Sequence, residues 1–103
     1  SSAAQTANAI ALRLDREGVC EMSCIAGVGG DVKSLVHKAF SESGNLFVLD
    51  GCRLSCAKEC LARHGIEIRH HFILSDYGVK KTQHADPDPW DVERLTEEVK
   101  SLL

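Results

Sequence analysis

Three cysteines recur at intervals of four in the stretch VLDGCRLSCAKEC, which begins where an apolar run stops. Thiols in such a place suit three roles: soft ligands for a metal ion, nucleophiles, or small buried side chains. Cys52 and Cys56 lie four residues apart around a predicted helix start, so they can converge on one ion. Cys60 would lie about 12 Å from Cys52 along a helix axis, so we expect it to be buried packing.

The two remaining cysteines lie on a predicted strand at residues 19–26. Cys20 and Cys24 share one face of it, but four strand residues span about 13 Å, whereas zinc holds sulfur at about 2.3 Å. We therefore expect Cys24, near the carboxyl end, to contribute to the site, and Cys20 to be a small buried side chain. The count of five thiols is odd, and no secretory signal is visible, which favours metal binding, catalysis or burial over a disulfide framework.

Length and composition limit the class of protein. The chain has 103 residues, 44% of them hydrophobic, which suits a single domain over residues 1–103. The net charge of −3, with acids and bases mixed along the chain, gives no basic face for nucleic acid. No apolar run approaches the roughly 18 residues of a membrane span. These features predict a cytoplasmic protein that binds neither nucleic acid nor membrane.

Hydrophobic periodicity and turn residues predict helices that alternate with strands along the chain. Gly18, Gly44 and Gly65 end predicted helices, and Asp31 and Asp88 are the expected N-caps of two others. Helices are expected at residues 3–17, 32–43, from the DGC triplet to Gly65, and at 89–102, with strands at 19–26, 46–49 and 66–74.

This alternation predicts an α/β fold: a three-layer sandwich with a mostly parallel sheet and helices on both faces, Rossmann-like or flavodoxin-like. Because the chain opens in a helix, we expect the first strand of such a sheet to be missing. The loops at 24–31, 50–53 and 75–81 should meet at the carboxyl edge of the sheet. There Lys80 and Lys81 could supply positive charge, and the glycine loop 27–30 should lie beside Cys52.

Three segments resemble the DGC-domain family: MSCIAGVGG (residues 22–30), LDGCRLSCAKECL (residues 49–61) and GVKK (residues 78–81). The family is associated with zinc through four candidate chelating cysteines, so the resemblance implies zinc as the cofactor. By motif position Cys24, Cys52 and Cys56 match three of the four. The fourth would lie in a turn upstream of Ser1. Weaker candidates for the remaining ligand are Cys60 and His71.

Three functions stay open at this point. The first is a zinc-binding domain with a cysteine cluster at the carboxyl edge of a parallel sheet. The second is a thiol-based enzyme or redox module that uses Cys52 as nucleophile, and the third is an interaction domain with buried structural cysteines. The sequence identifies no catalytic residues, substrate or protein partner, so whether the chain is an enzyme is left open.

Overall fold

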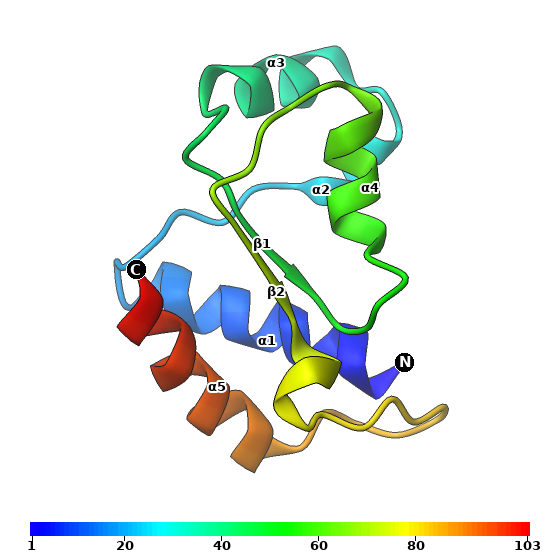
Figure 1. Cartoon of the computed structure of the whole chain (residues 1–103), viewed down its shortest axis with the longest axis vertical. Coiled ribbons are helices and arrows are strands. Elements are labelled where there is room, and N and C mark those ends of the chain that lie inside the picture. Colours follow the sequence, from blue (N-terminus) through cyan, green and yellow to red (C-terminus); the bar gives the residue numbers. More distant parts are fainter.

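The fold is built around a two-stranded parallel sheet with helices packed on it (Figure 1). The structure, a computed structural model, describes all of residues 1–103. Phe47 lies opposite His70 in the sheet, and Asp50 lies opposite Ile73. In chain order the elements are α1 (Ser2–Arg16), α2 (Ile25–Gly29), α3 (Lys33–Ser41), β1 (Phe47–Asp50), α4 (Cys56–Arg63), β2 (His70–Ile73), the short 3-10 helix η1 (Leu74–Tyr77) and α5 (Pro89–Leu102).

Strand β1 separates two hydrophobic cores. Phe47 and Leu49 pack against the first core, whereas Val48 belongs to the second. Alternate residues of a strand point to opposite faces, so this apolar run is covered on both sides, as its composition predicts. The first hydrophobic core, here called the α1/α5 core, contains Ala3, Ala7, Ile10, Leu14, Phe72, Leu74, Val79, Leu95 and Val99. The second, the α4 core, contains Val28, Ala39, Val48, Leu61 and Ile66.

The predicted helices form where the apolar periodicity places them, and most of their boundaries are confirmed within one or two residues. Gly18 follows α1 with a φ of 72°, a left-handed conformation that favours glycine. At the start of α5 the Asp88 carboxylate accepts a hydrogen bond from the Trp90 backbone N–H at 2.9 Å. Pro89 occupies the first helical turn there, where its missing N–H is not needed.

The predicted strand at residues 19–26 is wrong. Residues 19–24 run as an irregular chain from α1 to α2, and Ile25 and Ala26 already belong to α2 (Figure 1). Three backbone N–H groups of this segment are bound by the end of α1, because those of Val19 and Cys20 donate to the Leu14 carbonyl and that of Met22 donates to the Asp15 carboxylate at 2.9 Å. The Met22 hydrogen bond holds the pKa of Asp15 below its ordinary value. A β-rich composition alone did not reveal this competition for hydrogen bonds.

The strand predicted at 66–74 is shorter than expected and runs only from His70 to Ile73. Ile66 and Ile68 pack on the α4 core, whereas Phe72 lies in the α1/α5 core, so the residues before His70 do not continue the strand with one face toward a single core. The predicted parallel pairing is therefore present, with helices packed around two strands. Two strands are too few to define the predicted Rossmann-like or flavodoxin-like sandwich.

Candidate functional site

Asp50 fixes the turn that follows β1. It is only 5% exposed, and its carboxylate accepts hydrogen bonds from the backbone N–H groups of Ala57 at 2.8 Å and Lys58 at 3.2 Å. The Nε2 atom of His71 lies 2.8 Å from the same carboxylate. A carboxylate only accepts hydrogen bonds, so this nitrogen carries the proton. Asp50 thus caps α4 from the end of the preceding strand and also binds β2.

Gly51 lets α1 approach this turn closely. A methyl group at Gly51 would lie 2.5 Å from the carbonyl carbon of Ala3 and 2.7 Å from its oxygen. The Gly51 carbonyl also accepts a hydrogen bond from the Ser75 N–H at 3.1 Å. Any side chain at this position would therefore collide with the backbone of α1.

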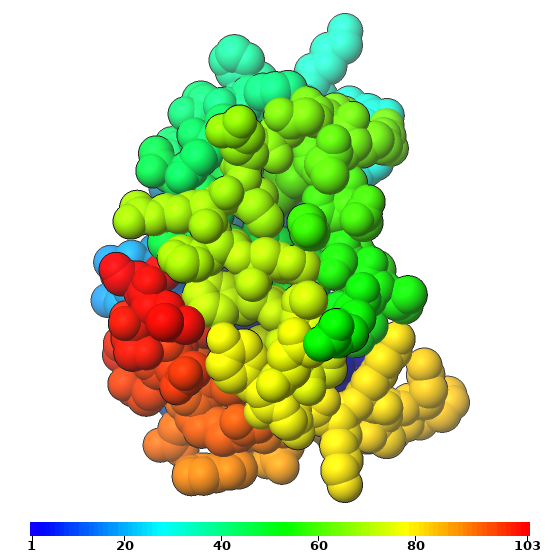
Figure 2. All heavy atoms as spheres, viewed as in Figure 1, coloured from blue at the N-terminus to red at the C-terminus, as the bar shows by residue number.

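Cys52 lies against a lysine from a distant part of the chain. Lys81 Nζ donates to Cys52 Sγ at 3.5 Å. Arg53 and Asp76 form an ion pair at 2.9 Å that joins the same two segments. In Figure 2 the segment after β1, in green, adjoins the yellow segment that contains η1 and the residues after it. The ammonium group of Lys81 is thus in direct contact with the sulfur atom of Cys52.

The neighbours of Lys81 are fastened to the start of α1. Ser2 Oγ donates to the Lys80 carbonyl at 3.1 Å and accepts from the Thr82 N–H at 2.9 Å. The Ser2 N–H in turn donates to the Thr82 carbonyl at 3.0 Å. The residues on both sides of Lys81 are held, so its side chain starts from a fixed backbone.

The start of α4 differs from the predicted one. The helix begins at Cys56, not at the DGC triplet, because Asp50 caps the Ala57 and Lys58 N–H groups and Ser55 has a left-handed φ of 56°. Cys52 therefore lies in the turn before the helix, and Cys56 is its first residue. The N-terminus of α4 therefore lies at Cys56 and not at Cys52.

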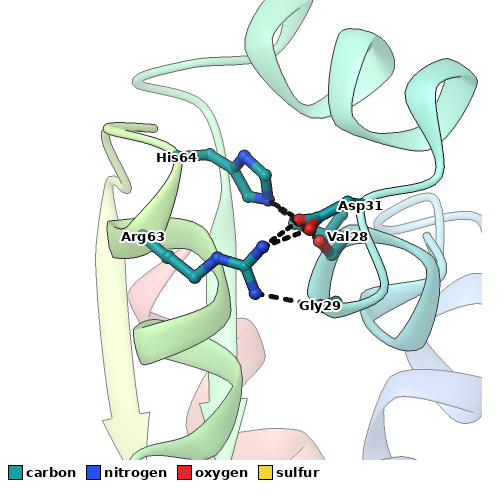
Figure 3. A network of polar contacts seen from close by, with 5 residues as sticks. All are labelled: Val28, Gly29, Asp31, Arg63 and His64. Carbon is teal, nitrogen blue, oxygen red and sulfur yellow. Dashed lines mark hydrogen bonds and ion pairs between the residues drawn. The ribbon is translucent and has the colours of Figure 1, made fainter.

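The glycine segment of α2 lies beside the end of α4, not beside Cys52. A methyl group at Gly29 would lie 3.0 Å from Cys60 Sγ. Figure 3 shows the polar contacts at this place, where Arg63 donates to the Gly29 carbonyl at 3.3 Å and also pairs with Asp31. His64 Nε2 lies 3.1 Å from the Val28 carbonyl and 2.9 Å from the Asp31 carboxylate. The prediction that the glycine loop 27–30 lies beside Cys52 is therefore wrong.

Asp31 is held by these contacts instead of capping a helix. Val32 occupies the N-cap position of α3, and Asp31 has a left-handed φ of 61°. The Arg63 guanidinium and, to a lesser degree, His64 hold the pKa of Asp31 below its ordinary value. The predicted capping role of Asp31 is therefore wrong.

The structure does not gather the predicted zinc ligands. No three side chains of His, Cys, Asp or Glu lie close enough together to hold one metal ion. Cys24 occupies the N-cap position of α2, and the weaker candidate His71 is bound to Asp50. Cys60, the other weaker candidate, is half-buried beside Gly29. In this arrangement the thiols do not fit a zinc ion, and zinc binding by Cys24, Cys52 and Cys56 stays a prediction.

The sequence indicated one feature of the site, the lysine charge, but not the other, the link between Asp50 and His71. The GVKK segment pointed to lysine charge at this edge, and Lys81 is there. The link between Asp50 and His71 was missed, although Asp50 directly follows a buried strand, where a carboxylate needs partners. Burial also raises the pKa of Cys20, in keeping with its predicted packing role.

Fold and site together define a small α/β domain whose Asp-Gly-Cys turn caps a helix and presents a thiol beside a lysine. The chain matches the DGC domain over residues 1–99, and it therefore belongs to the DGC domain family, as its motifs indicated. It is 52% identical over 104 residues to the anaerobic and virulence modulator AnvM of Pseudomonas aeruginosa. That match covers 100% of this chain and 78% of the relative. No solved structure matches the chain significantly. None of its helices has the length and apolar character needed to cross a membrane.

Proposed function

We propose that this protein, like its relative AnvM, is a modulator of anaerobic responses, and that the Cys52 thiol is the group through which it responds. The observation that carries this proposal is the contact of Lys81 Nζ with Cys52 Sγ at 3.5 Å. The relative's name supports a modulating role over an enzymatic one.

The chemistry of thiols supports this choice of residue. A thiolate reacts with oxidants much faster than a thiol does, and cationic neighbours favour the thiolate. Cys52 is partly exposed, so a small oxidant can reach it. Lys81 is exposed as well, and the hydrogen bonds of Ser2 with the residues on either side of it hold the backbone from which its side chain reaches the sulfur.

Alkylation kinetics tests the reactive thiol. In the wild-type protein, iodoacetamide should modify Cys52 faster than Cys20, whose pKa burial raises. Lys81→Met should slow the modification of Cys52 several-fold, because the nearby cation is lost. Lys80→Met is the matched control, since it removes the adjacent lysine but leaves the Cys52 contact in place. Equal Cys52 rates in all three proteins would remove the basis of the proposal.

Complementation tests the modulating role. Expression of this chain in Pseudomonas aeruginosa that lacks AnvM should restore the anaerobic behaviour of the strain, and Cys52→Ser should not. Restoration by Cys52→Ser at equal protein levels would instead favour an interaction domain with structural cysteines.

Zinc binding is the second candidate, supported by the family motif and by the state of the thiols. Cys24, Cys52 and Cys56 are free, and all are exposed or partly exposed. Binding one ion would require the irregular segment before α2 to move Cys24 toward the DGC turn. Elemental analysis of purified protein tests this candidate. Zinc that is retained in Cys60→Ala but lost in Cys56→Ala supports it, whereas metal-free wild-type protein counts against it.

A further inference from the structure

We infer that Cys52 and Lys81 become joined by a covalent sulfur–nitrogen bond when a peroxide oxidises the protein. This inference rests on the proposed role of Cys52 and names the chemical form that the oxidised site takes. The oxidant class is a hydroperoxide, of which hydrogen peroxide is the simplest.

The geometry favours the lysine as the group that captures oxidised Cys52. Lys81 Nζ already contacts the sulfur at 3.5 Å, although the two residues are far apart in sequence. The ion pair of Arg53 with Asp76 and the hydrogen bond from Ser75 to Gly51 hold the same two segments together. The nitrogen therefore needs only a small side-chain movement to reach bonding distance.

The first step oxidises the thiolate. The Cys52 sulfur attacks one peroxide oxygen, the O–O bond breaks, and the departing hydroxide takes up the extra proton of the Lys81 ammonium group to form water. This two-electron step reduces hydrogen peroxide and leaves a sulfenic acid on Cys52.

The second step is a condensation without further oxidation. The Lys81 amine, after losing its extra proton, attacks the sulfur of the sulfenic acid. A sulfur–nitrogen bond forms, the sulfur–oxygen bond breaks, and the oxygen leaves as water with a proton from the nitrogen. Sulfenic acids condense in the same way with backbone nitrogens. Two molecules of a thiol reductant restore both side chains and become a disulfide.

The linked form differs from the reduced one in charge and in mobility. It lacks the ammonium charge of Lys81, and it joins the DGC turn covalently to the segment after η1. A partner that binds this surface would therefore contact a site with one positive charge fewer and a less mobile DGC turn.

Peptide mass spectrometry tests the inference on the intact chain. After treatment with hydrogen peroxide, alkylation and trypsin digestion, residues 39–53 should appear linked to residues 81–94, with the summed mass less two hydrogens. Cleavage after Lys81 should be lost, and a thiol reductant should restore it. Circular dichroism confirms that each variant stays folded.

Two lysine variants give the matched comparison. Lys81→Arg keeps the positive charge but lacks the amine nucleophile, so the linked peptide should vanish while a sulfenic acid on Cys52 becomes trappable by dimedone. Lys80→Arg should still form the linked peptide.

The remaining outcomes overturn different statements. A trappable sulfenic acid on wild-type Cys52 without a linked peptide overturns the inference and leaves the proposed function standing. A disulfide between Cys52 and Cys56 also overturns the inference. Oxidation of Cys52 no faster than that of Cys20 would count against the proposed function itself.

Discussion

The carboxylate of Asp50 connects three segments of the chain. It binds two N–H groups of α4 and the imidazole of His71 in β2, and it is almost completely buried. A buried charge is tolerated only when its partners compensate for the lost hydration. The aspartate of the DGC triplet therefore has a structural role, and the turn that carries Cys52 depends on it.

Replacing this carboxylate should destabilise the protein. Asp50→Asn keeps the size of the side chain but loses its charge and turns one acceptor into a donor, which faces donors already present. We expect a loss of about 2 kcal/mol in the free energy of unfolding, measured by urea denaturation. Asp76→Asn, which breaks only the exposed pair with Arg53, is the control and should cost less than about 1 kcal/mol. Similar losses in both variants would contradict the assigned role of Asp50.

The contact of Asp31 with Arg63 predicts a pH dependence of stability. Because the folded state lowers the pKa of Asp31, the folded protein holds fewer protons there than the unfolded chain. The contribution is fully present above the ordinary aspartate pKa of about 3.9 and is lost as the pH falls through the lowered value.

Thermal unfolding of Asp31→Asn tests this dependence, and asparagine suits the left-handed backbone at this position. The wild-type protein should melt at a higher temperature than the variant at pH 7. The gap should close as the pH falls below about 4. A gap that is constant over this range would mean that ionisation of Asp31 does not contribute to stability.

At the scale of elements, the packing of α1 on the DGC turn requires a residue without a side chain. The Gly51→Ala methyl group would meet backbone atoms of Ala3, which cannot move without shifting the helix. Gly44 has a left-handed φ of 85° and no neighbour within 4 Å of an added methyl group, so it is the matched control.

The two glycine variants should therefore differ in stability. We expect Gly51→Ala to cost about 3 kcal/mol, as overpacking does at its upper range, and Gly44→Ala about 1 kcal/mol. Urea denaturation of both proteins measures the difference. An equal or larger cost for Gly44→Ala would show that α1 yields easily at this contact.

The sequence predicted elements whose signals are local. Apolar periodicity identified α1, α3 and α5, the predicted cap Asp88 begins α5, and the unbroken apolar run identified β1. The strand at 19–26 was predicted wrongly because its donors bind Leu14 and Asp15, a competition that β-propensity does not encode. The position of Cys52 relative to α4 was predicted wrongly as well, because the capping residue lies on a preceding strand instead of at the usual N-cap position.

At the scale of the whole molecule, the two cores lie on opposite faces of β1. Val48 faces the α4 core, and its neighbours Phe47 and Leu49 face the α1/α5 core. A sheet of two strands is too small to be stable without both coverings. We therefore expect the two cores to unfold together, as the predicted single domain requires.

A destabilising substitution in one core should lower the unfolding midpoint of the other core by the same amount. Leu61→Ala removes a buried side chain from the α4 core and should cost about 2 to 4 kcal/mol. Trp90, at the start of α5 on the other side of the sheet, serves as the fluorescent probe. In Leu61→Ala, the urea midpoint measured by Trp90 fluorescence should shift by the same amount as the midpoint measured by far-ultraviolet circular dichroism. A Trp90 midpoint that Leu61→Ala leaves unchanged would indicate two units that unfold independently.

The hydrogen bonds of Ser2 with Lys80 and Thr82 have a practical consequence for handling the protein. They place the first residues of the chain beside the DGC turn, whereas Lys100 pairs with Glu17 at the far end of α1 (Figure 1). An affinity tag fused before Ser1 would crowd the thiol whose reactivity is to be measured. A purification handle after Leu103 lies at the opposite end of α1 and leaves the approach to Cys52 open.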